Sequence, residues 1–202
     1  MANLKNNSLI ISTTCLVLFI LLLVGIKLGP FISLDNYILS YFNPSGFMLI
    51  LSQAIALVFD TLSISIISLV IVLILYLLNK KKEAIFLALI ILTDGIVVFI
   101  FKELLQRARP ENLIETGFSF PSGHSTISIV FIGSLIYLFI NNIKSNSWRN
   151  FIVVVLSLFI LLIGFTRLYL QVHWFTDVIG GFLIGGAILF FYIYLFKRLK
   201  EQ

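Results

Sequence analysis

The sequence predicts an all-α integral membrane protein, a six-span transmembrane helical bundle with short interfacial helices between spans 1 and 2. Of its 202 residues, 60% are hydrophobic and 11% are charged, and the mean hydropathy is +1.11. No soluble core needs that much apolar sequence. Because a helix needs about 20 apolar residues to cross a bilayer, this length allows five to seven spans. We expect residues 1–202 to form a single membrane-embedded domain.

Long apolar runs place the six spans. The first run resembles a signal peptide, but it is long and is followed by no small-x-small cleavage site, which favours an uncleaved anchor. Cys15, the only cysteine, lies in this run, so no internal disulfide and no thiolate-based metal site is expected. Asp60 and Thr61 can cap the second span. The predicted spans are residues 8–28, 62–78, 83–107, 123–140, 148–168 and 176–196.

The stretch between the first and second spans is less regular. Residues 31–42 alternate apolar and polar side chains, which indicates an amphipathic helix at the membrane interface. Residues 43–46 (Asn-Pro-Ser-Gly) then break the chain. Residues 47–59 form a further apolar helix, short for a span. We interpret both helices as a partly embedded lid or access region. A plain connecting loop is the alternative.

The formal charge of +5 comes mostly from short loops between apolar runs, which is typical of topology control, so no nucleic-acid partner is expected. Six spans place both termini on one side of the cell membrane. Basic residues favour the cytoplasmic side, which predicts cytoplasmic termini and polar loops on the extracytoplasmic side. The termini's side carries nine basic residues, namely Lys5, Lys80, Lys81, Lys82, Lys144, Arg149, Lys197, Arg198 and Lys200. The other side carries five, namely Lys27, Lys102, Arg107, Arg109 and Arg167.

Two cations end the third span. Lys102 and Arg109 are seven residues apart, so on a continuing helix they share a face two turns apart. Together they predict an anion site. Snorkelling of both side chains to lipid headgroups is the alternative interpretation.

The sequence Pro121-Ser122-Gly123-His124 opens the fourth span. Helix N-termini expose unpaired N–H groups and the positive end of the dipole, which favour bound phosphate. Gly123 lets the backbone approach an anion closely, and Ser122 can add a hydroxyl donor. Beside such a site, His124 is predicted to transfer protons. A hydrogen-bonded interface histidine is the alternative.

A third polar group precedes the sixth span. Thr166-Arg167 is followed five residues later by His173, and Asp177 comes four residues after His173. On a helical turn, His173 and Asp177 would face the same way, so that the carboxylate fixes the imidazole tautomer. Arg167 can clamp phosphate oxygens. A structural His–Asp pair that caps the sixth span is the alternative.

This inventory predicts phosphoryl transfer through a phosphohistidine. The cations and backbone donors would stabilise phosphoryl charge, one histidine would attack phosphorus, and the other would carry the proton. No H-E-x-x-H motif is present, and no metal site is predicted. Of the acidic residues near the predicted site, we expect only Asp177 to be well placed. The others are Glu103, Glu111 and Glu115.

These blocks resemble the type-2 phosphatidic acid phosphatase superfamily, integral-membrane lipid phosphatases that share their site with vanadium haloperoxidases. The family pattern is K-x6-R-P, then P-S-G-H, then S-R-x5-H-x3-D, and residues 102–177 match every spacing, with Thr166 in place of the usual serine. The resemblance implies that His173 is the nucleophile, Asp177 its orienting partner and His124 the general acid. It implies phosphate binding by Lys102, Arg109, Ser122, Gly123 and Arg167.

The resemblance also implies metal-independent, cofactor-free hydrolysis of a lipid phosphate or pyrophosphate. Undecaprenyl pyrophosphate, phosphatidylglycerophosphate and phosphatidic acid all fit, and the sequence does not choose among them or set an oligomeric state. The alternative is a membrane protein that binds or transports lipid headgroups without hydrolysis. Outside the motifs, Asp94 lies mid-span and should have a polar partner. It is either part of a polar network below the site or a structural partner of a Ser or Thr of a neighbouring helix. Gly181 and Gly185 predict close helix packing.

Overall fold

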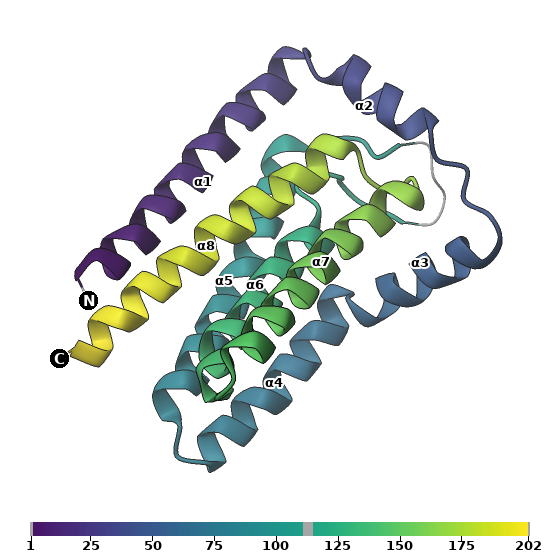
Figure 1. Ribbon diagram of the computed structural model, residues 1–202. Coiled ribbons are helices and arrows are strands. Elements are labelled where there is room, and N and C mark those ends of the chain that lie inside the picture. The colour runs from purple at the N-terminus through teal and green to yellow at the C-terminus, as the bar shows by residue number, and fades with distance from the viewer. Residues whose placement is uncertain (1, 111–114, 202) are drawn as a thin grey trace.

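The computed structural model describes residues 2–110 and 115–201, and the regular elements of these residues are all helices, as predicted (Figure 1). In chain order they are α1 (Ala2–Leu28), α2 (Ile32–Ser40), α3 (Gly46–Val58), α4 (Thr61–Leu77), α5 (Lys81–Leu105), α6 (Gly123–Phe139), the 3-10 turn η1 (Ile140–Asn142), α7 (Asn146–Tyr169) and α8 (Phe175–Glu201). The two helices predicted between the first and second spans are α2 and α3.

Five helical segments are long and apolar enough to cross a membrane, namely α1, α5, α6 together with η1, α7 and α8. The predicted second span is α4, which is shorter at 17 residues. It continues from α3 through a bend of 47°, so the pair forms either a broken sixth span or a re-entrant segment. The bend falls at Asp60, whose carboxylate accepts a hydrogen bond from Leu62 N at 3.0 Å and so caps α4 as predicted. The protein is therefore a multi-pass membrane protein of five to six spans.

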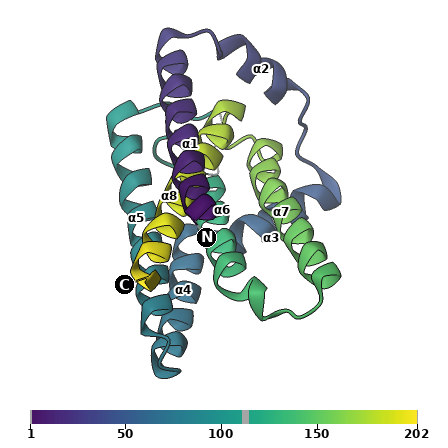
Figure 2. The same ribbon diagram turned by 60° about the vertical axis from the view of Figure 1, so that its left-hand side comes forward.

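Helix α8 lies at the centre of the bundle, with α1 along one side and α6 along another (Figures 1 and 2). Two glycines allow the approach of α6. A Cβ atom on Gly181 would lie 2.6 Å from Ser122 O, and one on Gly185 would lie 2.8 Å from Thr126 O. These distances are below van der Waals contact, so the backbones meet only because side chains are absent. The predicted close packing at both glycines is confirmed.

The predicted third span is wrong at its end. Helix α5 stops at Leu105, and Gln106 takes the left-handed conformation at φ 48°. Its N–H donates to Lys102 O at 2.9 Å and so closes the helix. Pro110 disfavours helical backbone at the residue before it. Arg109 therefore lies in a non-helical segment, and it does not share a helix face with Lys102.

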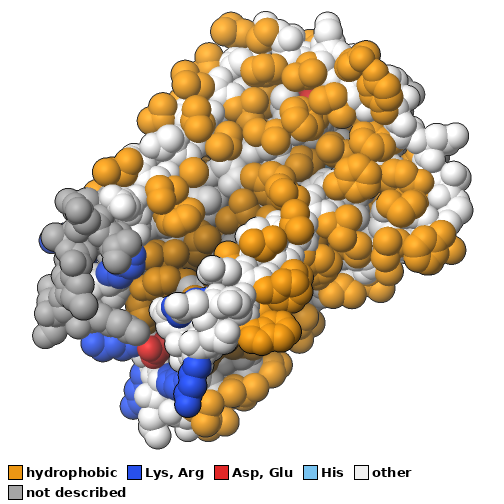
Figure 3. All heavy atoms as spheres, viewed as in Figure 1, with side chains coloured by type: hydrophobic (Ala, Val, Ile, Leu, Met, Phe, Trp, Pro, Cys, Tyr) orange, Lys and Arg blue, Asp and Glu red, His pale blue; other side chains and the backbone are white. Residues whose placement is uncertain are grey.

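The two ends of the bundle differ. Both termini lie at the same end as the α4–α5 and α6–α7 turns, whereas the α1–α2 and α7–α8 connections lie at the other end (Figure 1). Hydrophobic side chains cover most of the face in Figure 3, and Lys and Arg side chains gather towards the end with the termini. The basic residues counted on the termini's side thus share one end of the bundle.

Candidate active site

A cavity of about 360 Å³ opens at the end of the bundle opposite the termini. Five of the eight predicted site residues line it, and they come from α5, from the α5–α6 connection, from the N-terminus of α6 and from the α7–α8 connection. The lining residues are Asp60, Thr61, Val98, Lys102, Arg109, Glu115, Thr116, Gly123, His124 and His173.

His173 lies in the connection between α7 and α8 and is buried, with 1% of its surface exposed. Arg109 Nη1 lies 3.2 Å from its Nε2. Because a guanidinium can only donate, Nε2 must be the acceptor. In the neutral ring the proton is then on Nδ1, and Nε2 keeps a lone pair. Burial lowers the pKa of His173, against the opposing effect of the Asp177 carboxylate, so the ring is neutral at neutral pH.

Asp177 lies in the first turn of α8, and His173 precedes that helix, so the expected pairing on one helical turn is wrong in its geometry. The two side chains still meet, because the chain turns before Phe175. His173 Nδ1 lies 3.5 Å from Asp177 Oδ2, an ion-pair distance longer than a typical hydrogen bond. The same Oδ2 accepts from Trp174 N at 2.9 Å and thereby caps α8. Asp177 therefore both faces the histidine and stabilises the helix end.

The two cations of the first motif, Lys102 and Arg109, line the cavity and are held by backbone carbonyl groups. Lys102 Nζ donates to Phe118 O at 3.0 Å. Arg109 donates through Nε to Gly117 O at 3.1 Å and through Nη1 to Val172 O at 2.9 Å. These carbonyl contacts hold the side chains in place, so the two cations are fixed at the cavity rather than extended towards lipid headgroups.

Arg167, in the last turn of α7, is 1% exposed. Its Nη2 donates to Glu115, while its Nε and Nη1 find no hydrogen-bond partner among the described residues. Such buried, unsatisfied guanidinium donors are rare in folded proteins. They are suited to an anion that brings several acceptor oxygens.

Glu115 is placed differently from the expectation that only Asp177 among the acidic residues is well positioned. Its carboxylate pairs with Arg167, lies 2.8 Å from Arg109 Nη1, and has an oxygen 4.0 Å from His173 Nε2. Partial burial by itself raises the pKa of Glu115, but the charges around it, Arg167 foremost, outweigh this effect and hold the pKa below its ordinary value. An ionised carboxylate thus lies between two guanidinium groups beside the histidine.

His124, in the first turn of α6, is 8% exposed. Its Nε2 lies 3.0 Å from Ala56 O, near the C-terminus of α3. A carbonyl oxygen only accepts, so Nε2 must carry the proton of this hydrogen bond. Nδ1 is left as the ring nitrogen that can exchange a proton in the cavity.

Ser122 caps α6 and is fully buried. Its hydroxyl oxygen accepts from Ser125 Oγ at 3.0 Å and from Ser125 N at 3.4 Å. Its backbone N–H donates to Asp177 O at 3.0 Å, which ties the start of α6 to the start of α8. Gly123 lines the cavity, and a Cβ atom there would meet only ordinary contacts at 3.8 Å. Phosphate binding by Ser122 and Gly123 therefore stays a prediction.

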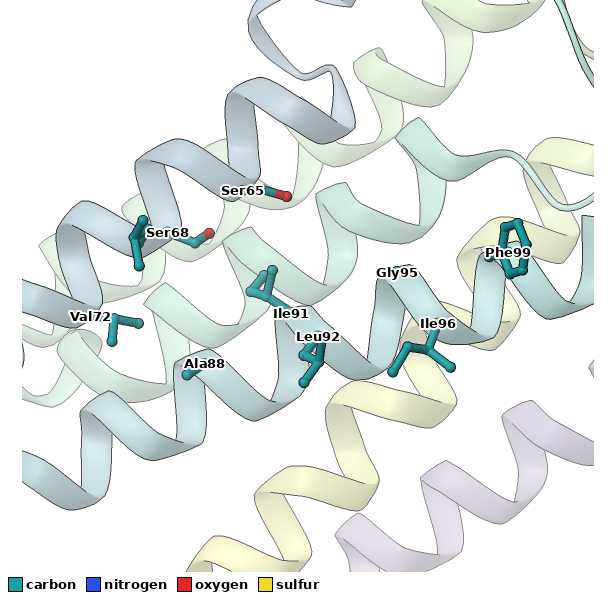
Figure 4. Close-up of a pocket in the computed structure, with 10 residues that line it drawn as sticks. Ser65, Ser68, Val72, Ala88, Ile91, Leu92, Gly95, Ile96 and Phe99 are labelled. Carbon is teal, nitrogen blue, oxygen red and sulfur yellow. The ribbon is translucent and has the colours of Figure 1, made fainter.

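A second, apolar cavity of about 510 Å³ lies between α4 and α5 (Figure 4). It begins one helical turn from the first cavity, because Ser65 follows Thr61 by four residues on α4 and Phe99 follows Val98 on α5. Asp94 precedes Gly95, one of the residues that line this cavity, and its side chain is buried. Its Oδ1 has no hydrogen-bond partner among the described residues, so the expected Ser or Thr partner is not found for this atom.

Two further residues join the site that the sequence patterns did not assign to it. Arg107 contacts Asp177, and Asp35 of α2 contacts Arg107. In the sequence, Arg107 is visible only as a further basic residue inside the first motif, and Asp35 only as the acidic residue of the amphipathic stretch 31–42. Glu111, also noted in the sequence, lies outside the described residues. In the described parts of the chain, no three His, Cys, Asp or Glu side chains converge as metal ligands.

The fold and these contacts define a multi-pass helical membrane protein in which two histidines and three cations come together at one end of the bundle. Comparison with known families agrees, since the sequence model described as "PAP2 superfamily" matches residues 83–201, more than half of the chain. The chain belongs to the PAP2 superfamily.

Individual proteins show the same similarity. The chain is 30% identical over 132 residues to phosphatidylglycerophosphatase B of Bacillus subtilis. This alignment covers 61% of this chain and 64% of that protein. It is 29% identical over 127 residues to an undecaprenyl-diphosphatase of Sulfolobus acidocaldarius, covering 57% of each. The alignments thus span about three fifths of the length of these curated relatives.

A crystal structure of a transmembrane PAP2-type phosphatidylglycerolphosphate phosphatase from Bacillus subtilis superimposes with a TM-score of 0.82. The superposition covers 95% of this chain and 96% of that chain at 23% identity. At this identity the likeness establishes the fold, and it confirms the predicted helical membrane architecture.

Proposed function

We propose that this protein is a metal-independent membrane lipid phosphatase that hydrolyses a lipid phosphomonoester or pyrophosphate through a phosphohistidine. The observation that carries the proposal is the pair of guanidinium groups, of Arg109 and Arg167, that holds an anionic group beside His173. There, Arg109 and Arg167 hold the Glu115 carboxylate 4.0 Å from Nε2, and Arg167 keeps two further donors without partners among the described residues. The carboxylate oxygens stand in for two oxygens of a phosphoryl group.

The chemistry follows from the two imidazoles. The Nε2 lone pair of His173 attacks phosphorus, and the bond from phosphorus to the lipid or diphosphate oxygen breaks while protonated His124 gives that oxygen a proton. Water then attacks the phosphohistidine, His124 takes its proton, and the P–N bond breaks to release phosphate. Lys102, Arg109 and Arg167 stabilise the charge on the phosphoryl oxygens. Asp177 stabilises the proton on Nδ1 of His173.

The apolar cavity between α4 and α5 supports a lipid substrate. It begins one helical turn from the charged cavity, and apart from Ser65, Ser68 and Gly95 its lining is aliphatic or aromatic (Figure 4). A phosphate in the charged cavity and an acyl or isoprenoid chain between α4 and α5 would each lie in matching surroundings. Undecaprenyl pyrophosphate, phosphatidylglycerophosphate and phosphatidic acid all have this form, and the first two agree with the names of the relatives.

We further propose that the termini lie in the cytoplasm and that the site faces the extracytoplasmic side. The excess of Lys and Arg at the end of the bundle with the termini supports this orientation. A site at the outer face suits a lipid phosphate that is released or recycled on that side of the membrane.

The test is phosphate release in detergent from phosphatidylglycerophosphate, phosphatidic acid, diacylglycerol pyrophosphate and undecaprenyl pyrophosphate, each with and without EDTA. We expect turnover of at least one lipid, no effect of EDTA, and loss of turnover in His173→Ala. Loss of activity with EDTA would contradict the metal-independent mechanism. Lipid binding with no phosphate release across the panel would instead favour a headgroup-binding or transport protein.

A further inference from the structure

A buried ion network connects α2 to the catalytic carboxylate. Arg107, just after α5, donates through Nη1 to Asp177 Oδ1 at 2.5 Å and through Nη2 to Asp35 Oδ2 at 2.6 Å. Asp35 is 1% exposed and Asp177 is fully buried. One guanidinium thus lies between two buried carboxylates, each of which needs a partner because its charge has been removed from water.

Asp35 also holds the start of α8. Its Oδ1 accepts from Thr176 N at 3.0 Å, and its Oδ2 accepts from Thr176 Oγ1 at 2.7 Å. Thr176 is in the first turn of α8, where unpaired N–H groups and the helix dipole favour an anion. An aspartate about 140 residues away in sequence therefore caps the helix that carries Asp177.

The orientation of Arg107 is itself fixed. Its guanidinium lies 5.7 Å from the centre of the Trp174 ring, and Trp174 Nε1 donates to Ala108 O at 2.8 Å. Arg107 Nη1 donates to Thr176 Oγ1 at 2.7 Å as well. Four polar and aromatic neighbours hold the guanidinium where it reaches both carboxylates. Its bond to Oδ1 acts together with the Trp174 N–H, which donates to Oδ2, to orient Asp177.

We propose that Arg107 and Asp35 are positioning residues that keep the Asp177 carboxylate directed at His173 Nδ1. The proposal rests on the proposed function, because it gives Nε2 of His173 its role as nucleophile. Without Arg107, the two buried carboxylates would lose the cation between them, and the Asp177 side chain could turn away from His173. Asp177 would then no longer stabilise the proton on Nδ1 of His173.

Kinetics in detergent provide the first readout, with the lipid that the wild-type protein hydrolyses fastest. Arg107→Ala should lower kcat about 100-fold while KM stays within a few-fold, since the phosphate contacts remain and only alignment is lost. Arg107→Lys restores the charge but not the fork that reaches both carboxylates, so it should recover part of the rate. Asp35→Asn puts an amide N–H₂ group towards Arg107 and should lower kcat about tenfold.

A matched control comes from Gln171, which ties the end of α2 to the same connection without touching Asp177. Its Nε2 donates to Phe42 O at 2.7 Å. Gln171→Asn shortens the side chain, and asparagine tolerates the left-handed backbone of this position, where φ is 55°. This variant should keep the wild-type kcat. An equal loss of kcat in Gln171→Asn would overturn the proposal, because general tethering of α2 would then explain the effect.

The imidazole provides a readout that is independent of turnover. The chain has two histidines, so ¹⁵N-histidine labelling gives two ring spectra, which His124→Gln assigns. The His173 ring should be the neutral Nδ1–H tautomer in the wild type, where Arg109 donates to Nε2 and Asp177 faces Nδ1. In Arg107→Ala or, if that variant does not fold, in Asp35→Asn, only the Arg109 contact still favours this tautomer, so a fraction of the Nε2–H tautomer should appear. A wild-type His173 spectrum in the folded variants would overturn the network. If the wild type releases no phosphate, the proposed function fails, and this comparison still decides the positioning role.

Discussion

Among the individual side chains of this site, Glu115 has a particular effect, because its negative charge lies against the cations proposed to bind phosphate. Its carboxylate pairs with Arg109 and Arg167, the same two guanidinium groups that would bind phosphate. Since its pKa is held below the ordinary glutamate value, it remains an anion throughout the neutral range. A phosphoryl group must therefore displace it or share the two cations with it.

Removing this negative charge should strengthen phosphate binding. Glu115→Gln keeps the size of the side chain but leaves both guanidinium groups without an anionic partner, so inorganic phosphate should inhibit about tenfold more strongly, a difference of about 1.4 kcal/mol. The measurement is the competitive inhibition constant of phosphate. Glu103→Gln, an exposed glutamate on α5, is the matched control and should not change it. An unchanged inhibition constant in Glu115→Gln would show that Glu115 does not compete with phosphate for Arg109 and Arg167.

The pH dependence should report His173. The nucleophile is the unprotonated ring, and protonation removes the Nε2 lone pair, so kcat/KM falls as pH drops through the His173 pKa. Burial lowers that pKa below its ordinary value of 6.5, so the acid limb of the profile should lie below pH 6.5.

Asp177 acts on the same limb in the opposite direction, because its negative charge raises the His173 pKa. In Asp177→Asn the acid limb should therefore move to lower pH, while kcat falls on the order of 10³-fold as the tautomer is no longer held. An acid limb that moves to higher pH in this variant would contradict the assignment of His173 as the group titrated.

Helices bring the three motif blocks together, and the α6–α8 contact is the decisive one. Ser122 N donates to Asp177 O at 3.0 Å, and this hydrogen bond forms beside Gly181, where a Cβ atom would lie 2.6 Å from Ser122 O. The packing of the two helices thus sets the distance between the His124 end of α6 and the His173–Asp177 end of α8.

Gly181→Ala should separate these two helix ends. The added methyl group meets backbone, which cannot rotate away, so we expect a loss of about 1–3 kcal/mol in stability and a large loss of phosphate release. Thermal unfolding in detergent and the phosphatase assay measure the two effects. Gly95→Ala on α5 is the control for the stability measurement, because a Cβ atom there meets nothing within 4 Å, and it should leave the stability unchanged or raise it slightly. Wild-type activity in Gly181→Ala would refute this role of the contact.

The helices themselves could be predicted from the sequence because the bilayer imposes them. Long apolar runs must form helices that satisfy their own backbone hydrogen bonds, and the ends of the predicted spans match those of α1 and α4 to α8 to within six residues. The predictions failed where local pattern does not decide. Arg109 leaves the helix because of Gln106 and Pro110, and α3 and α4 meet at a bend that hydropathy does not encode.

The site could be predicted in part. Motif spacing identified five residues that line the cavity, and the basic character of the site followed from three costly cations beside the spans. Glu115, Arg107 and Asp35 were not assigned, because their roles depend on contacts between segments that are distant in the chain. Asp35 and Thr176, for example, are 141 residues apart. No periodicity within a helix reveals such a pair.

On the scale of the whole molecule, the two ends of the bundle have different charge and different tasks. The end with the termini carries most of the Lys and Arg residues, and the opposite end carries the site (Figures 1 and 3). This polarity is the basis of the proposed orientation in the membrane.

Single-cysteine labelling tests that orientation, since Cys15 is the only native cysteine. In a Cys15→Ser background, Tyr41→Cys after α2 should react with a membrane-impermeant maleimide in intact cells. Lys144→Cys in the α6–α7 turn should react only after permeabilisation. Both positions are exposed, and the background protein without cysteine controls for other labelling. The reverse pattern would place the site on the cytoplasmic side.

The central claim is that His173 forms the covalent intermediate. Rapid mixing of the protein with a hydrolysable lipid phosphate, an alkaline denaturing quench and mass spectrometry of the peptide that contains His173 test it most directly. We predict one phosphoryl group on His173, formed and lost at rates that match turnover, and absent in His173→Ala. Turnover without a phosphorylated protein, or with the phosphoryl group on another residue, would contradict the account.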